Sequence, residues 1–240
     1  MDLCRLATAE GVAAAAAAFI HARAVAAISE RGRFTLALSG GSTPWKMLAK
    51  LAEYELPWNL VAVVQVDERV AAAGDPERNL VHIQATLAGH VSLPTGNLHA
   101  MPVDRDDLDE AAIAYENALQ DIAGQPPVLD VVHLGLGPDG HTASLLPDDP
   151  VLDVADRDVA IAGPYFDHLR MTLTYPIINR ARHILWLITG EEKAPMLKRL
   201  LDGDNSVPAG RVSQQHATLI ADAAAFPHHT HDFTGVQGIC

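Results

Sequence analysis

The residue whose surroundings point most clearly to chemistry is His141, which stands in a glycine-rich segment after an apolar run. The segment 135–142 reads Gly-Leu-Gly-Pro-Asp-Gly-His-Thr, and such glycines leave an imidazole exposed unless another group positions it. An imidazole has an unperturbed pKa of about 6.5, so it can take a proton from water near neutral pH. The pattern therefore favours a general base over a packed histidine. Asp139 either holds the imidazole or binds a ligand, and a turn-forming aspartate explains it equally well.

A second candidate site is the turn Ser-Gly-Gly-Ser-Thr-Pro at 39–44, which follows another apolar run. Gly40 and Gly41 permit close approach of the backbone, and the free amides of Ser42 and Thr43 at a helix start favour a bound anion. The spacing matches neither G-x-x-x-x-G-K-[ST] nor G-x-G-x-x-G, so ATP and NAD are disfavoured. The turn predicts a phosphate-binding loop, with a tight turn that binds nothing as the alternative.

A third candidate site is the loop that we expect after the apolar run 60–66, where Asp67, Glu68 and Arg69 stand in a row and Asn79 comes after a turn. Arg69 is suited to pairing with an anion and Asp67 to binding sugar hydroxyls. A solvated strand end is the alternative. Ligands of open α/β sheets bind outside the carboxyl ends of the strands, so we expect all three segments at one edge.

The elements that position these residues alternate between strands and helices. We expect helices at 9–30, from the end of the turn 39–44 through 53, near 78–87 and at 191–201, and strands at 34–38, 60–66, 128–134, 170–174 and 183–188. Continuous Val, Leu and Ile runs separated by helices are typical of a mostly parallel sheet covered on both faces. The sequence predicts one α/β domain over 1–240, with 226–240 as a flexible tail.

Composition narrows the possible partners. The 240 residues are 49% hydrophobic, enough for a full core, and 30 acidic against 17 basic residues give a net charge of −13. Such a surface repels nucleic acid and anionic lipid. The apolar run 11–28 is broken by His21 and Arg23, and Cys4 and Cys240 form no metal-binding spacing. We expect a cytoplasmic protein, with neither nucleic acid nor a membrane as its partner.

His21, His82 and His183 have no motif around them, and we expect structural roles for them. Trp45 and Trp58 follow helix and turn signals, which favours core or rim aromatics over a platform on which a sugar stacks. The C-terminal histidines His228, His229 and His231 lack a fourth ligand at a recognisable spacing, which favours a terminal tail over a zinc site. Ser144 lies near His141 but lacks the G-x-S-x-G elbow of a serine esterase.

Five blocks of the chain together resemble the 6-phosphogluconolactonases, within the wider group of sugar-phosphate isomerases, deaminases and lactonases. The matching blocks are Leu-Ser-Gly-Gly-Ser-Thr-Pro at 38–44, Asp-Glu-Arg at 67–69 with Asn79, 135–145 around His141, Arg-Met-Thr-Leu-Thr at 170–174 and Thr-Gly-Glu-Glu-Lys at 189–193. The resemblance runs from about residue 10 to about residue 225 and includes a late helix at 222–224.

The resemblance implies hydrolysis of 6-phospho-D-glucono-1,5-lactone without metal or organic cofactor, on a modified Rossmann-like α/β sandwich. It implies that His141 is the catalytic histidine and that Gly40, Gly41 and Ser42 form the phosphate loop. Arg170 and Lys193 match basic residues near the phosphate. The matches to residues that line the sugar pocket are Asp67, Arg69 and Asn79. We expect a small-molecule substrate and a monomer or weak dimer.

The sequence also leaves rival functions and one departure from the family pattern. A deaminase of the same group typically carries an acidic residue five positions after the histidine, where this chain has Leu146. A sugar-phosphate sensor that has lost catalysis would keep the pocket but not turn over a lactone. Arg78 stands where the family commonly has serine, so the detail of that wall stays open.

Overall fold

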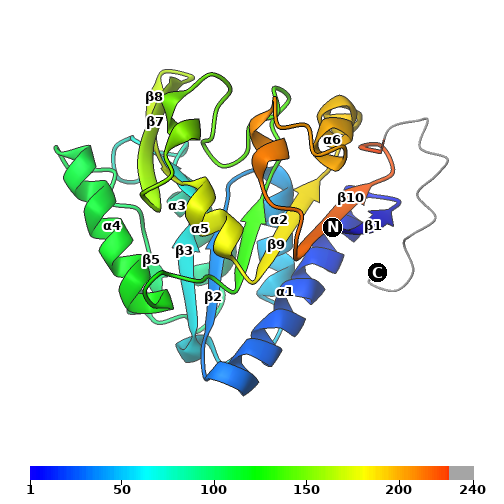
Figure 1. Ribbon diagram of the computed structural model, residues 1–240. Coiled ribbons are helices and arrows are strands. Elements are labelled where there is room, and N and C mark those ends of the chain that lie inside the picture. The colour runs from blue at the N-terminus through cyan, green and yellow to red at the C-terminus, as the bar shows by residue number, and fades with distance from the viewer. Residues whose placement is uncertain (227–240) are drawn as a thin grey trace.

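Seven strands form the central sheet of the structure, a computed structural model that describes residues 1–226 (Figure 1). Their order is β1-β10-β9-β6-β2-β3-β5, and every pair is parallel. The bounds are Asp2–Leu6 for β1, Phe34–Leu38 for β2, Val61–Gln65 for β3, Leu98–His99 for β5, Val131–Leu134 for β6, His183–Ile188 for β9 and Ala217–Asp222 for β10. The predicted α/β class with a mostly parallel sheet is confirmed.

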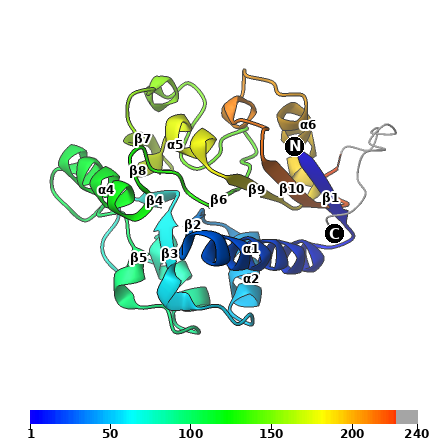
Figure 2. The same ribbon diagram turned by 60° about the horizontal axis from the view of Figure 1, so that its bottom comes forward.

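Helices cover both faces of this sheet (Figure 2). Their bounds are Ala9–Arg31 for α1, Ser42–Leu51 for α2, Asn79–Ile83 for α3, Leu108–Ala123 for α4, Tyr175–Arg180 for α5 and Ala194–Leu201 for α6. Within β9, Leu185 and Leu187 belong to the core under α1, α2 and α3, whereas Trp186 belongs to the core under α4, α5 and α6. Burial on both faces explains why the strands are continuously apolar.

Helix α1 packs lengthwise along the sheet. The Thr8 side chain accepts a hydrogen bond from Gly11 N (3.1 Å) at its start, and Gly32 ends it with a positive φ of 72°. By length and composition α1 is apolar enough to cross a membrane. Its Val12 and Ile20 side chains are nevertheless fully buried in the core.

A second, three-stranded antiparallel sheet stands beside the first. It consists of β4 (Asp67–Arg69), β8 (His168–Leu173) and β7 (Val159–Tyr165), in that order. The segment 67–69, expected to be a loop, is therefore a short strand, because its backbone pairs with β8. This pairing places Arg69 opposite Arg170, so the second sheet brings two cations to the edge where β3 ends.

The expected helix at 222–224 is wrong. Asp222 is the last residue of β10, and its carboxylate accepts hydrogen bonds from Gly190 N (3.1 Å) and Ala225 N (2.9 Å). These bonds stabilise a turn, because a carboxylate that holds backbone N–H groups competes with a helical ladder. They also tie the end of β10 to the loop after β9.

The C-terminal tail was expected to begin at 226. Phe226 is buried, and the Arg5 guanidinium carbon lies 5.5 Å from its ring centroid. The rest of the expected tail, 227–240, lies outside the described residues, and so do His228, His229 and His231.

Candidate active site

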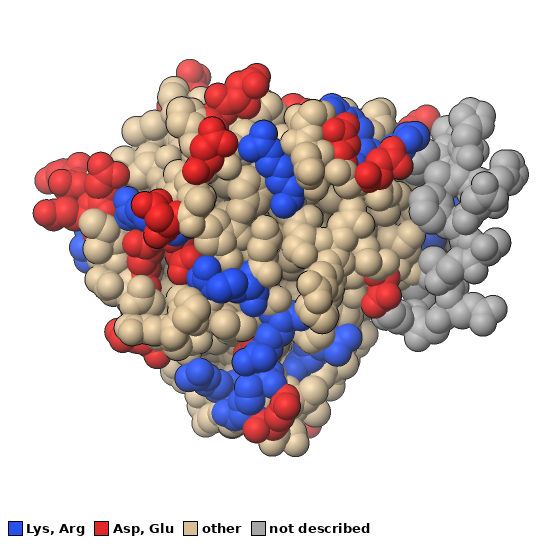
Figure 3. Space-filling model, in the orientation of Figure 1, with Lys and Arg blue, Asp and Glu red and all other residues tan. Residues whose placement is uncertain are grey.

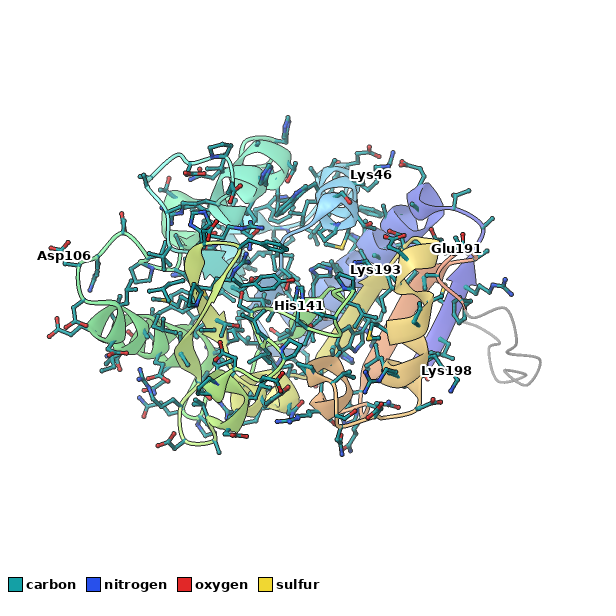
Figure 4. The ribbon with its side chains drawn as sticks, turned by 90° about the horizontal axis from the view of Figure 1, so that it is seen from above. Lys46, Asp106, His141, Glu191, Lys193 and Lys198 are labelled. Carbon is teal, nitrogen blue, oxygen red and sulfur yellow. The ribbon has the colours of Figure 1, made fainter. Side chains whose placement is uncertain are left out.

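The loops that follow β2, β4, β6 and β9 surround a cavity of about 600 Å³ at the carboxyl edge of the sheet. The sequence-predicted site residues that line it are Gly40, Gly41, Ser42, Thr43, Asp67, Arg69, Asn79, His141, Arg170 and Lys193. Asp139 is not part of the lining but contacts His141. Seen from above this edge, His141 lies near the middle of the molecule with Lys193 beside it, whereas Asp106 and Lys198 lie toward the periphery (Figure 4).

Charge is unevenly distributed over the surface. Figure 3 shows basic side chains gathered in a band across the lower part of one face, and acidic side chains mostly above and to the left of that band. The net charge of −13 is therefore not spread evenly over the surface of the protein.

The imidazole of His141 is held by Asp139. Nδ1 of His141 lies 2.5 Å from Asp139 Oδ1, and the same oxygen accepts the His141 backbone N–H at 3.1 Å. Burial alone would raise the pKa of Asp139, but the hydrogen bonds and charge of His141 outweigh it and lower that pKa. An ionised carboxylate only accepts hydrogen bonds, so Nδ1 carries a proton and donates the hydrogen bond to Asp139 Oδ1. When the ring carries a single proton, Nε2 is therefore the nitrogen with the free lone pair.

The turn that carries His141 leaves no room for a side chain at Gly137. A Cβ at this position would lie 2.1 Å from His141 Nδ1. Gly137 N donates to His141 O (2.8 Å), and Gly140, with a φ of 85°, closes the turn by donating to Gly137 O (3.1 Å). Ala209 N donates to Gly140 O (2.9 Å), so the turn is also tied to a neighbouring loop.

The glycine turn after β2 starts α2 and packs against α3. A Cβ at Gly40 would lie 2.0 Å from Asn79 Oδ1, so only glycine allows this close approach. Gly41 has a φ of 128° and directly precedes the helix. Thr43 Oγ1 lies 2.7 Å from Thr189 Oγ1, which joins the turn to the loop that carries Lys193.

Asp67 is a buried carboxylate at the floor of the cavity. Burial raises its pKa, opposed by the hydrogen bond that Ser144 Oγ donates to Oδ2 (2.8 Å) and by the charge of Arg170. The amide of Asn79 donates to the backbone oxygen of Asp67 at 2.9 Å. Ser144 is thus a hydrogen-bond donor to Asp67, and it is buried rather than exposed at an elbow.

Glu68 has a role that the sequence did not suggest. Its fully buried carboxylate accepts hydrogen bonds from Asn79 N (2.8 Å) and Leu80 N (2.9 Å) and so holds the start of α3. Arg78, the departure from the family pattern, lies with Nε 3.5 Å from Glu68 Oε2 and is also buried. The arginine therefore compensates a buried charge behind the cavity wall.

The cations of the cavity differ in the hydrogen-bond and ion-pair partners that they have within the protein. Arg69 Nη1 donates to the backbone oxygen of Glu77, and its Nε lies 4.0 Å from the Glu77 carboxylate. Arg170 is buried, which lowers the pKa of its guanidinium, and its Nε has no hydrogen-bond partner among the described residues. Lys193 takes part in no ion pair within residues 1–226, so its ammonium is available to an anion.

Trp45, expected as a core or rim aromatic, and His82, expected to be structural, also line the cavity. Trp45 follows the glycine turn, and its ring stacks on His82 at a centroid distance of 4.9 Å and an interplanar angle of 21°. His82 is fixed by a 2.9 Å hydrogen bond between Nε2 and the Pro76 carbonyl oxygen.

Within residues 1–226, no group of three or more His, Cys, Asp or Glu side chains is placed to hold a metal ion.

Comparison with known proteins identifies similar sequences and folds. Residues 7–221 match the family described as glucosamine-6-phosphate isomerases/6-phosphogluconolactonase. The chain is 40% identical over 207 residues to a 6-phosphogluconolactonase of Synechocystis sp., covering 84% of this chain and 86% of the relative. The crystal structure of 6-phosphogluconolactonase from Thermotoga maritima superposes with a TM-score of 0.82 at 28% identity, over 92% of this chain and 98% of that one.

The fold by itself does not separate the two activities of this group. A monomeric glucosamine-6-phosphate deaminase superposes with a TM-score of 0.81 at 20% identity, over 94% of this chain and 98% of that one. At that identity the likeness concerns the fold alone. Only the side chains of the cavity can therefore distinguish a lactonase from a deaminase.

Proposed function

Because the chain belongs to the glucosamine-6-phosphate isomerase/6-phosphogluconolactonase family, we propose that it hydrolyses 6-phospho-D-glucono-1,5-lactone to 6-phospho-D-gluconate. The observation that carries this proposal is the 2.5 Å contact between His141 Nδ1 and Asp139 Oδ1 at the wall of the cavity. It fixes one ring nitrogen as a donor and leaves the other to accept a proton. The sequence relatives named 6-phosphogluconolactonase support the choice of substrate.

In the proposed reaction His141 acts as general base and then as general acid. Nε2 takes a proton from a water molecule while the water oxygen forms a bond to the lactone carbon C1. The tetrahedral intermediate collapses by breaking the bond from C1 to the ring oxygen, and the imidazolium returns its proton to that oxygen. General-base catalysis of this kind contributes about 10²–10⁴-fold to the rate. No covalent intermediate with the enzyme is required.

The proposed orientation of the substrate follows from the charges in the cavity. The phosphate would lie against the free amides of 40–43 and the ammonium of Lys193. Arg170 would face the phosphate, and the sugar hydroxyls would lie against Asp67 and Asn79. This orientation brings C1 toward His141, and it includes no metal ion or organic cofactor.

The residue five positions after His141 favours lactone hydrolysis over deamination. Leu146 is buried, with 5% of its surface exposed, and it cannot carry a proton. Opening an amino sugar ring and transferring a proton between its carbons needs a further titratable group, which a leucine does not supply. A lactone is an activated ester and needs only the base and a site for the developing oxyanion.

The test is a turnover assay with freshly made lactone. Glucose-6-phosphate is oxidised enzymatically, and the appearance of 6-phosphogluconate is followed and corrected for spontaneous hydrolysis. We expect hydrolysis well above the spontaneous rate, and no ammonia release from glucosamine-6-phosphate in a parallel assay. Hydrolysis at the spontaneous rate would leave a non-catalytic sugar-phosphate sensor as the better reading, and ammonia release would point to a deaminase.

A further inference from the structure

Tyr165, at the end of β7, touches two parts of the candidate site at once, and we propose that it is a positioning residue for the Asp139–His141 pair. Its Oη donates to Asp139 Oδ2 at 3.4 Å, and its ring meets the His141 ring edge-on at a centroid distance of 5.3 Å and an interplanar angle of 67°. This inference rests on the proposed function, because it assigns a role in the same reaction.

The two oxygens of Asp139 face different elements. Oδ1 receives the backbone N–H and Nδ1–H of His141, whereas Oδ2 receives the Tyr165 hydroxyl from the second sheet. A carboxylate held at both oxygens cannot rotate freely about its χ2 angle, so Nδ1 of His141 meets its acceptor in one orientation. Tyr165, which is 24 positions after His141 in the sequence, therefore stabilises the turn that carries His141.

Tyr165 is itself held in place on its other side by Arg170. The guanidinium carbon of Arg170 lies 5.3 Å from the Tyr165 ring centroid, and Arg170 Nη2 donates to the Tyr165 carbonyl oxygen at 3.4 Å. The phenol thus lies between a cation of the cavity and the Asp139–His141 pair. Burial and the negative charge of Asp139 raise the pKa of Tyr165, so the hydroxyl stays protonated and can donate at neutral pH.

The backbone before Tyr165 is constrained as well. Gly163 has a φ of 92°, a Cβ there would lie 2.9 Å from Tyr165 N, and its own N–H donates to Asp149 Oδ2 at 2.8 Å. Tyr165 does not line the cavity. It therefore acts on the reaction through its neighbours and not by touching substrate.

The experiment compares Tyr165→Phe with Tyr165→Ala in the full chain, using the lactone assay. The phenylalanine keeps the ring contacts with His141 and Arg170 but loses the hydrogen bond to Asp139. We expect Tyr165→Phe to lower kcat about three- to tenfold with KM within twofold, because a long hydrogen bond to a charged group is lost. We expect Tyr165→Ala to lower kcat about ten- to a hundredfold and to raise KM, because Arg170 also loses its support.

A double-mutant cycle separates positioning from a merely structural role. If Tyr165 acts through Asp139, Tyr165→Phe has no further effect on kcat in the Asp139→Ala background. Leu169→Ala is the matched control, since Leu169 lies on the same hairpin and is 40% exposed; we expect it to keep wild-type kcat.

Each outcome decides the proposal. Wild-type kcat in Tyr165→Phe, or the same loss of kcat with and without Asp139, would overturn it while leaving the lactonase function intact, since the wild type and Leu169→Ala still turn over. If the wild type itself hydrolyses lactone no faster than water does, both proposals fail. Should Tyr165→Ala not fold, the phenylalanine variant and its cycle still give the answer.

Discussion

The Cα of Gly137 and the imidazole of His141 are so close that a Cβ on Gly137 would lie 2.1 Å from His141 Nδ1. The glycine is thus required by the side chain it faces and not only by the turn. The Asp139 carboxylate approaches the imidazole from the same side as Gly137. Its Oδ1 atom would lie 2.7 Å from a Cβ on Gly137.

Gly137→Ala should therefore lower kcat by about one to three decades, because the imidazole and the carboxylate must move apart. The unfolding temperature should change little, since the His141 side chain is 22% exposed and has room to turn outward. Gly96→Ala is the control, because a Cβ there also meets no atom within 4 Å and Gly96 does not line the cavity. Equal losses of kcat in the two variants would show that the close approach to His141 is irrelevant.

Lys193→Ala tests where the phosphate lies. A desolvated charge-assisted contact is worth roughly 1.5–3 kcal/mol, so kcat/KM for the phosphorylated lactone should fall about ten- to a hundredfold. Unphosphorylated gluconolactone should be hydrolysed at an unchanged rate. Lys198→Ala is the control, since Lys198 is 63% exposed and pairs with Asp202 at 2.5 Å. An equal loss with both substrates would place the lysine at the lactone end or in the fold.

His133 predicts a pH dependence of stability. Burial lowers the pKa of this fully buried histidine to about 3, against about 6.5 in an unfolded chain. The unfolded state therefore binds the extra proton first, so this contribution to stability is complete above about pH 6.5 and is lost as the pH falls toward 3. Between pH 7 and pH 5 the loss in free energy of unfolding is about 2 kcal/mol.

The control for this prediction is His133→Asn. His133 Nδ1 accepts the Ser39 backbone N–H at 3.3 Å, and an asparagine oxygen can take the place of Nδ1 without titrating. Denaturant unfolding at pH 7 and pH 5 should show a smaller loss of stability in the variant than in the wild type. The same loss in both proteins would mean that another group is responsible.

Much of the fold could be predicted because it is encoded locally. The apolar runs at 34–38 and 183–188 coincide with β2 and β9, and the predicted helix 9–30 differs from α1 by one residue. The second sheet was missed because β4 has only three residues, all of them charged, and becomes a strand only by pairing with a segment a hundred residues away. No local pattern carries that information.

The same limit applies to the candidate site. Residues with unusual local surroundings, such as His141 and Gly40, could be picked out in the sequence, and the structure brings them to one cavity. The roles of Glu68 and Tyr165 could not be inferred from the sequence, because each depends on partners that only the folded chain supplies. His82 was expected to be structural, and its place in the cavity wall likewise follows from a contact between two helices, the stacking of its ring on Trp45.

Whether His141 takes the proton from water is tested by the turnover of His141→Ala with freshly made lactone, alongside the Kd for 6-phosphogluconate. We expect kcat to fall by about two to four decades while the Kd changes little, because the imidazole acts on the reacting water and not on the phosphate. Wild-type kcat in this variant would contradict the assignment, and so would a loss of activity explained entirely by weaker binding of 6-phosphogluconate.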